Sequence, residues 1–425
     1  MTSAFPIHSL NITSYASFNG SHLYPLEFQH SFTTFTTFTT TPASADEGIQ
    51  GLSSTSTSDS LQCPTFTKED SEFKVAFSFW VEGVIQVILA GFGILGNILS
   101  CFVLTRKEMR NSFNLLLVTL ATFDTCYLIG AILESLRKSF HSASDVHILM
   151  FPYFLYPLYQ TSMAGSIFMT VAIAFERYSA VHLPVNYSQS LNDAHAMKRR
   201  LLKYIIPVCI LSFLLNVPKF LEAEIKYQKV TMVPTTLSEN DQSETLIGLL
   251  INPQFQAFYM KPVLSITPLR MHPLYSNYNN WSRLFVLGII PFALLVFFNP
   301  KVKNKGLYAR IRALNAFMPH PNRATSQRRS EDNLAAIFMG IILIFLICHF
   351  PRVMMNIHEL AIIHRSASCA EADRPQFSLW SLIMISVSHV FLVLNSATNM
   401  IVYCLLSLKF RSECVKILSS VWIRK

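Results

Sequence analysis

The chain has 425 residues, of which 51% are hydrophobic and 14% are charged, and its formal net charge is +9. Soluble domains carry roughly 25% charged residues, so this composition indicates that much of the chain lies in lipid. The positive charge would suit a nucleic-acid-binding protein. However, the basic residues form short clusters beside apolar segments, which is the pattern of membrane topology, and nucleic acid is therefore not an expected partner.

Residues 1–75 are polar and rich in serine and threonine, and they include the run TTFTTFTTT. No basic stretch followed by a short apolar stretch is present there, so a cleavable signal peptide is not expected. The sequons at Asn11 and Asn19 predict a glycosylated, extracellular tail without fixed structure. A tail with no specific role is an equally good interpretation.

Seven apolar stretches follow, each long enough to cross the hydrocarbon layer of a membrane. They are expected near residues 78–104, 112–136, 149–181, 202–220, 283–299, 333–363 and 378–405. The predicted fold is an all-α membrane protein, a seven-transmembrane helix bundle over residues 76–406. Residues 407–425 place apolar side chains among basic ones, which predicts a short amphipathic helix, helix 8, followed by a short cytoplasmic tail.

Lysine and arginine clusters indicate the orientation of the bundle. The clusters at 106–110, 198–203, 301–329 and 409–425 fall on one side, which the positive-inside rule assigns to the cytoplasm. The N-terminus is then outside, and residues 222–281 form a long outer loop with no evident secondary structure.

The eight cysteines show no CxxC pair and no metal-ligand spacing, so neither a metal site nor a disulfide framework is expected. Six fall in or beside apolar stretches. Only Cys63 and Cys369 fall in outer segments, and an oxidising compartment tends to pair such cysteines. One disulfide is therefore predicted between them.

A few polar residues interrupt the apolar stretches, and their positions are informative. They are Asn97, Asp124, Ser166, Asn395, Ser396 and Asn399. A lone carboxylate in an apolar helix must face the bundle interior and find partners there. Hydroxyl and amide oxygens around one carboxylate suit a sodium ion. The alternative is a hydrogen-bonded network that only joins helices.

These positions and several motifs together resemble the rhodopsin-like (class A) G-protein-coupled receptors over roughly residues 75–422. The motifs, in the order of that family, are Asn97, LATFD with Asp124, Glu176-Arg177-Tyr178, Pro291, FLICHFP and NMIVY. The resemblance implies that Glu176 holds Arg177 in the resting receptor and that Arg177 meets a heterotrimeric G protein in the active one.

The resemblance also implies three groups of functional residues. Those for G-protein coupling are Glu176, Arg177, Tyr178, Pro184, Glu331 and Tyr403. Those of a pocket for an allosteric sodium ion are Asp124, Ser166, Asn395, Ser396 and Asn399. Those connecting the ligand pocket to the inner opening are Ile167, Pro291, Phe345, His349 and Pro351.

The chain also departs from the usual pattern of that family. Neither residues 149–165 nor the loop 222–281 contains a cysteine, so the family's usual outer disulfide cannot form. His349 stands where a tryptophan is usual, and Met400 where a proline is usual. The same losses, and the segments NVPKFLE and NSATNMIVYC, resemble the invertebrate FMRFamide-receptor branch. Residues 300–306 look like a short insertion, or an error in the sequence.

The residues facing the predicted outer pocket indicate the ligand class. Residues 149–165 contain no acid for an amine ligand, and residues 378–405 contain no lysine for retinal. The predicted ligand residues are Tyr127, Glu134, Tyr156, Tyr159, Gln160, Asn356, Glu359 and His389. Two carboxylates among aromatic and amide groups suit a peptide that carries an arginine and an aromatic end. The resemblance to the FMRFamide-receptor branch implies that this peptide is short, amidated and FMRFamide-like. Alternatively, Glu134 and Glu359 are solvated rim residues, and the ligand is another peptide or an unknown one.

Enzymes and transporters are the competing classes. HELAI at 358–362 resembles the zinc-protease motif HExxH but has Ile362 in place of the second histidine, so it cannot place two imidazoles one turn apart. No internal repeat or pair of broken helices indicates a transporter. The prediction is therefore a non-enzymatic, multi-pass receptor of the plasma membrane.

Overall fold

The computed structural model describes residues 63–109, 111–182, 194–231, 258–298, 321–371 and 374–423. The predicted sequons at Asn11 and Asn19, the coupling residue Pro184 and the possible insertion at 300–306 lie outside these residues.

In this part of the chain, seven helices are long and apolar enough to cross a membrane. They are Lys68–Leu104, Ser112–Lys138, Asp145–Ala180, Met197–Leu221, Pro273–Phe298, Ile337–Ala361 and Leu379–Ala397, called spans 1 to 7 below. The predicted seven-helix bundle is therefore confirmed.

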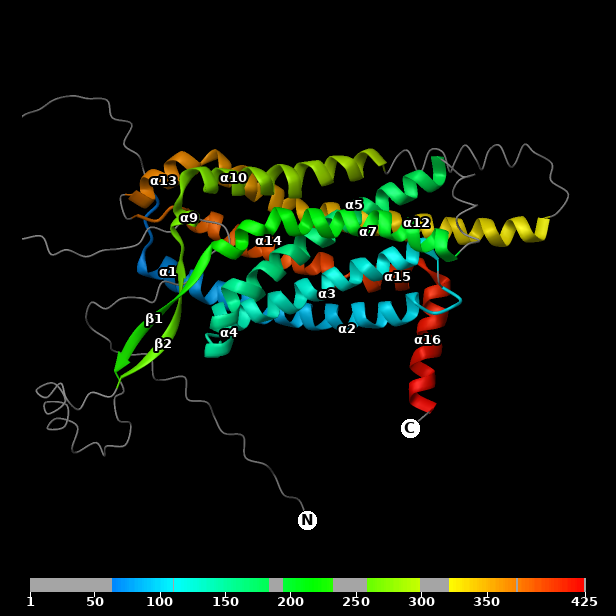
Figure 1. Cartoon of the computed structure of the whole chain (residues 1–425), viewed down its shortest axis with the longest axis horizontal. Coiled ribbons are helices and arrows are strands. Elements are labelled where there is room, and N and C mark those ends of the chain that lie inside the picture. Colours follow the sequence, from blue (N-terminus) through cyan, green and yellow to red (C-terminus); the bar gives the residue numbers. More distant parts are fainter. Residues whose placement is uncertain are drawn as a thin grey trace, which may run out of the picture.

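The spans are built from the labelled helices of Figure 1, several of which join end to end. The bounds are α1 (Lys68–Ser78), α2 (Gln86–Leu104), α3 (Ser112–Lys138), α4 (Asp145–Met150), α5 (Tyr156–His182), α7 (Ala194–Asn216), α9 (Pro268–Met271), α10 (Pro273–Leu284), α12 (Pro321–Ala361), α13 (Ile363–Glu371), α14 (Leu379–Ala397), α15 (Asn399–Leu406) and α16 (Leu408–Ile423). Wider π-helical turns at Phe79–Ile85, Phe151–Leu155 and Phe285–Ile289 and a 3₁₀ turn at Val217–Leu221 complete spans 1, 3, 5 and 4.

Two spans begin well before the apolar stretches that predicted them. Span 1 starts at Lys68, where the Thr67 side chain caps the helix and Asp70 closes a capping box. Span 5 starts at Pro273 rather than near 283, because proline suits a first helical turn. The added turns are polar, so hydropathy alone could not include them.

A β-hairpin lies between spans 4 and 5, where no secondary structure was expected. Strand β1 (Ala223–Thr231) pairs antiparallel with β2 (Phe258–Ile266), with Ala223 opposite Ile266 and Thr231 opposite Phe258. A two-stranded hairpin is marginally stable alone. Its base is therefore important, and there Ala223 is buried against Phe151 and Tyr156.

The outside of the bundle is apolar. Phe92, Leu95 and Leu405 each expose more than 65% of their surface. Such side chains suit contact with lipid chains rather than water. Trp80, Trp281 and Trp380 are also exposed, near the starts of spans 1, 5 and 7. The interior is packed with large buried side chains that include Phe113, Phe338, Phe345 and Tyr403.

The two ends of the bundle differ, as Figure 1 shows. One end, called the hairpin end, carries β1, β2, α1, α9 and α13. The opposite end, called the α16 end, carries α16 and the start of α12. Helix α16 lies where the amphipathic helix was predicted, with Phe410 and Cys414 buried against the bundle.

Candidate functional site

At the α16 end, Glu176 and Arg177 form a buried ion pair. Arg177 Nε lies 2.6 Å from Glu176 Oε2, and Arg200 of α7 approaches Oε1 to 3.5 Å. Glu176 is fully buried, and the Arg177 guanidinium lies 4.2 Å from the centre of the Phe113 ring. The Glu176 carboxylate and the Phe113 ring hold the Arg177 guanidinium in place, and Arg200 of α7 shares the same carboxylate.

The other predicted coupling residues lie near this pair or outside the described side chains. Tyr178 packs on Phe298 at 5.2 Å between ring centres. Tyr403 is fully buried beside Phe410, and its hydroxyl has no hydrogen-bond partner among the described residues. Glu331 lies in the first turns of α12, but its side chain is not among those described.

Midway along the bundle, Asp124 of α3 is fully buried and hydrogen-bonded. Ser166 Oγ donates to Asp124 Oδ1 at 2.6 Å, and Asn399 Nδ2 donates to Oδ2 at 2.7 Å. The Ser396 side chain also bonds this carboxylate, and Asn395 is buried beside it on α14. Sequence positions 124, 166, 396 and 399 thus form one cluster.

The cluster has the donor set of a site for a small, hard cation. A carboxylate and hydroxyl and amide oxygens are the ligand types that such cations prefer. Asn97, whose Nδ2 donates to the Ser396 carbonyl oxygen at 3.0 Å, has a buried Oδ1 without a hydrogen-bond partner in the described part of the chain. A spare buried acceptor on a residue that contacts Ser396 of this cluster is compatible with a sodium ion.

The predicted connector residues lie in spans 3, 5 and 6. Ile167 and Phe345 belong to the same buried core. The His349 ring stacks on Phe345 with centres 4.0 Å apart, in the place where the family usually has a tryptophan. Pro291 is buried in span 5, and Pro351 lies inside α12, where a proline removes one helical hydrogen bond and favours a kink.

Two adjoining pockets open toward the hairpin end, sharing Met163 and Leu392. The first, here called the polar pocket, has a volume of about 530 Å³ with its opening to solvent included, and is lined by Glu82, Gln86, Glu134, Ser135, Lys138, Ser139, Tyr159, Gln160, Met163, His389 and Leu392. The second, here called the arginine pocket, has a volume of about 350 Å³ measured in the same way, and is lined by Met163, Ile167, Arg283, Leu287, Gly288, His349, Arg352, Val353, Asn356 and Leu392.

Most of the predicted ligand residues line or adjoin these pockets. Glu134, Tyr159, Gln160 and His389 line the polar pocket, and Asn356 lines the arginine pocket. Tyr127 stacks on Tyr159 with ring centres 5.0 Å apart.

Tyr156 lies elsewhere than predicted. It lines neither pocket, because its hydroxyl donates to Glu222 Oε2 at 2.7 Å. The outer-loop residue Glu222, rather than a ligand, is therefore its partner.

The two predicted carboxylates are already paired. Arg137 contacts Glu134 with two hydrogen bonds of 3.1 and 2.7 Å. Glu359 is 5% exposed and lies between Arg283 at 3.9 Å and Arg352 at 4.0 Å. Neither acid is a solvated rim residue. A basic group of a ligand would have to compete with the arginines that already pair with these acids.

Four charged residues that line these pockets were not predicted as site residues: Glu82, Lys138, Arg283 and Arg352. Glu82 accepts from Lys138 at 2.6 Å and lies 3.2 Å from His389 Nδ1, and Arg283 and Arg352 line the arginine pocket. An ionisable residue inside a membrane span is by default a functional candidate, and that signal would have found Glu82 and Arg352.

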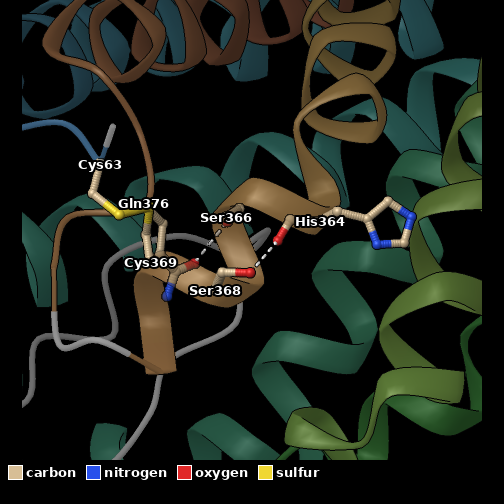
Figure 2. The surroundings of a disulfide bond; sticks show 6 residues. All are labelled: Cys63, His364, Ser366, Ser368, Cys369 and Gln376. Carbon is tan, nitrogen blue, oxygen red and sulfur yellow. Dashed lines mark hydrogen bonds between the residues drawn. A yellow bond between two sulfur atoms is a disulfide. The ribbon is translucent and has the colours of Figure 1, made fainter. Parts of the chain in front are cut away.

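At the hairpin end, Cys63 forms a disulfide with Cys369 of α13, with Cα atoms 5.6 Å apart (Figure 2). This is the pairing predicted from the two outer cysteines. Beside it, the Ser366 hydroxyl donates to Gln376 at 3.3 Å. The bond ties the segment before α1 to the connection between spans 6 and 7.

The bundle and its buried clusters define a seven-helix membrane receptor, and sequence comparison agrees. The family described as "7 transmembrane receptor (rhodopsin family)" matches residues 96–403, so the chain belongs to that family.

The individual proteins that the chain resembles share about a quarter of its residues. The chain is 26% identical over 341 residues to a protein of Drosophila melanogaster named "FMRFamide receptor", covering 78% of this chain but 53% of the fly protein's length. It is 23% identical to "Probable G-protein coupled receptor frpr-1" of Caenorhabditis elegans, covering 79% of this chain and 78% of that protein. It is 24% identical to the "Thyrotropin-releasing hormone receptor" of Gallus gallus, covering 81% and 80%.

Proposed function

We propose that the protein is a plasma-membrane receptor for an extracellular neuropeptide, a short amidated FMRFamide-like peptide, and that it activates heterotrimeric G proteins. The hairpin end then faces outward, with the tail sequons Asn11 and Asn19 glycosylated, and the α16 end faces the cytoplasm. The observation that supports the ligand class is the similarity to the fly FMRFamide receptor over 341 residues.

The polar pocket supports a ligand with a basic group. It is lined by two carboxylates, Glu82 and Glu134, but by one lysine. A ligand arginine would meet these acids in competition with Lys138 and Arg137, exchanging one ion pair for another. Aromatic Tyr159 and the amide of Gln160 would contact the rest of a short peptide.

The buried ion pair at the α16 end supports coupling to a G protein. Arg177 is held by Glu176 and lies against Phe113, so a partner entering at this end would need to displace Glu176 to reach the guanidinium. The cost of breaking this pair would bias the free receptor toward its resting state.

The Asp124 cluster supports binding of an allosteric sodium ion. Asp124, Ser166, Asn395, Ser396 and Asn399 would hold the ion, which would supply one positive charge to the buried carboxylate. A carboxylate in mid-membrane is otherwise expensive to keep ionised.

The test is expression of the receptor in cells that report calcium and cyclic AMP, with a panel of amidated neuropeptides that includes FMRFamide. Each peptide is paired with its free-acid form. Activation by amidated FMRFamide-like peptides, with loss of potency for the free acids, is expected. Activation by an unrelated peptide of the panel instead would favour the alternative, a class A receptor for another ligand.

A further inference from the structure

The Glu222 carboxylate lies at the junction between span 4 and the hairpin. It follows the last turn of span 4 directly and precedes the first residue of β1, and it is 1% exposed. Its Oε1 accepts from Lys219 Nζ at 2.6 Å and from the Tyr275 hydroxyl at 2.6 Å. Its Oε2 accepts from the Tyr156 hydroxyl at 2.7 Å and lies 3.6 Å from Arg270.

These four partners come from four different segments of the hairpin end. Tyr156 begins α5 in span 3, Lys219 belongs to the last turn of span 4, Arg270 belongs to α9 and Tyr275 to α10. One carboxylate therefore joins spans 3, 4 and 5 and the segment that follows β2.

The backbone at the same place closes the base of the hairpin. Thr267 N donates to the Glu222 carbonyl oxygen at 3.2 Å, and Thr267 Oγ1 donates to that of Leu221 at 2.5 Å. The end of β2 is thus hydrogen-bonded to the start of β1 at the residue whose side chain contacts Lys219, Tyr275, Tyr156 and Arg270.

No covalent bond performs this task. The sequence has no cysteine at residues 149–165 or 222–281, and the disulfide of the hairpin end joins Cys63 to α13 instead. We propose that Glu222 is a non-covalent clamp that holds the hairpin and α10 against the hairpin end of span 3. The proposal concerns the architecture of the receptor and does not depend on the identity of its ligand.

The charges of the clamp make its loss costly. Lys219 and Arg270 are both more than 90% buried. Removing the carboxylate would take this anion away from two cations that are shielded from water. Breaking such a buried ion pair is strongly destabilising. The spacing of Lys219 and Glu222, three residues apart in the segment NVPKFLE, allows the two side chains to meet across one helical turn.

The clamp also positions the arginine pocket. Lys219 Nζ donates to Asn279 Oδ1 at 2.7 Å, one turn before Arg283 on α10. Arg283 Nε in turn donates to the Asn279 carbonyl oxygen at 3.2 Å. By fixing Tyr275 and Asn279, the clamp sets the rotation of α10 and so directs Arg283 toward Glu359 in span 6. Glu222 is thus a positioning residue for that pocket.

The test is hydrogen exchange, read by mass spectrometry, on the full-length receptor purified in detergent. Glu222→Gln removes the charge and keeps the shape. Glu224→Gln is the matched control, because it makes the same change two residues along β1 at a partly exposed site that pairs with Lys226. Tyr275→Phe removes one hydrogen bond and keeps every charge, and it serves if Glu222→Gln fails to fold.

The expected result is exchange at least about tenfold faster across 223–231, 258–266 and 273–283 in Glu222→Gln, with residues 395–406 unchanged. Tyr275→Phe should accelerate exchange across 273–283 by a smaller factor. Glu224→Gln should leave exchange unchanged across the hairpin and across 273–283. A Cys63→Ser and Cys369→Ser double variant should leave the hairpin protected. Equal exchange in Glu222→Gln and Glu224→Gln, no acceleration in Tyr275→Phe, or loss of hairpin protection on removing the disulfide would each overturn the proposal.

Discussion

The carboxylate of Glu359 lies 3.9 Å from the guanidinium of Arg283, so an ion pair joins spans 6 and 5 at the arginine pocket. Arg352 approaches the same carboxylate to 4.0 Å, which places one acid between two buried cations. Arg283 and Arg352 both line that pocket. The pair is therefore both a structural link and a point that a ligand can contact.

Replacing Glu359 by glutamine should destabilise the receptor by about 3 kcal/mol or more, because both arginines would lose their shared anion in a buried place. The measurement is the temperature of half-unfolding of purified receptor, compared with Glu224→Gln, which changes a partly exposed acid. Equal temperatures for the two variants would mean that the arginines find other anions.

Replacing Arg177 by alanine should preserve surface expression and ligand binding but abolish G-protein activation, because the side chain lies at the α16 end, far from both pockets. The measurement is nucleotide exchange on purified G protein at matched receptor density. Arg199→Ala is the control, since it removes an exposed arginine one residue from Arg200. Normal exchange by Arg177→Ala would remove this arginine from the coupling mechanism.

Sodium should lower the affinity of an agonist, and Asp124→Asn should remove that effect. An agonist that contracts the Asp124 cluster competes with the ion, and linkage requires the agonist to lower sodium affinity by the same factor. The measurement is agonist competition binding in sodium against an equimolar bulky organic cation. If the unmodified receptor gives the same affinity in both salts, the cluster only joins helices. The replacement of the family's usual proline by Met400 is the reason to test for that outcome.

The contribution of Glu222 to stability should be constant from about pH 7 down to about pH 5. Burial alone would raise the pKa of this carboxyl, but Lys219 and Arg270 and the hydroxyl of Tyr275 outweigh it and lower the pKa from 4.5 to about 2. Tyr156 donates to the same carboxylate from span 3. The ionised form therefore stabilises the folded receptor above about pH 4.5, and this stabilisation is lost as the pH falls toward 2.

The measurement for this prediction is the difference in unfolding temperature between the unmodified receptor and Glu222→Gln, followed as the pH is lowered. The difference should shrink only below about pH 4.5. A difference that shrinks between pH 7.5 and 6 would point to a histidine instead of this carboxyl.

The spans and the Asp124 cluster could be predicted because their signals are local or follow a fixed order along the chain. The hairpin could not, since its base depends on Glu222, whose partners Tyr156 and Tyr275 lie more than 50 residues from it on either side. The ion pairs of the pockets were missed for the same reason. Sequence showed that Glu359 is an acid in a span, but only the fold brings Arg283 to it.

The three exposed tryptophans have a spectroscopic consequence. Trp80, Trp281 and Trp380 lie near the starts of spans 1, 5 and 7, while the place under Phe345 that could have held an indole holds the His349 ring. Their emission therefore reports the membrane boundary at the hairpin end and not the packing of the core. With the fourth tryptophan, Trp422 of α16, replaced by phenylalanine, quenchers attached at chosen depths in a nanodisc would read the tilt of these spans without an added label.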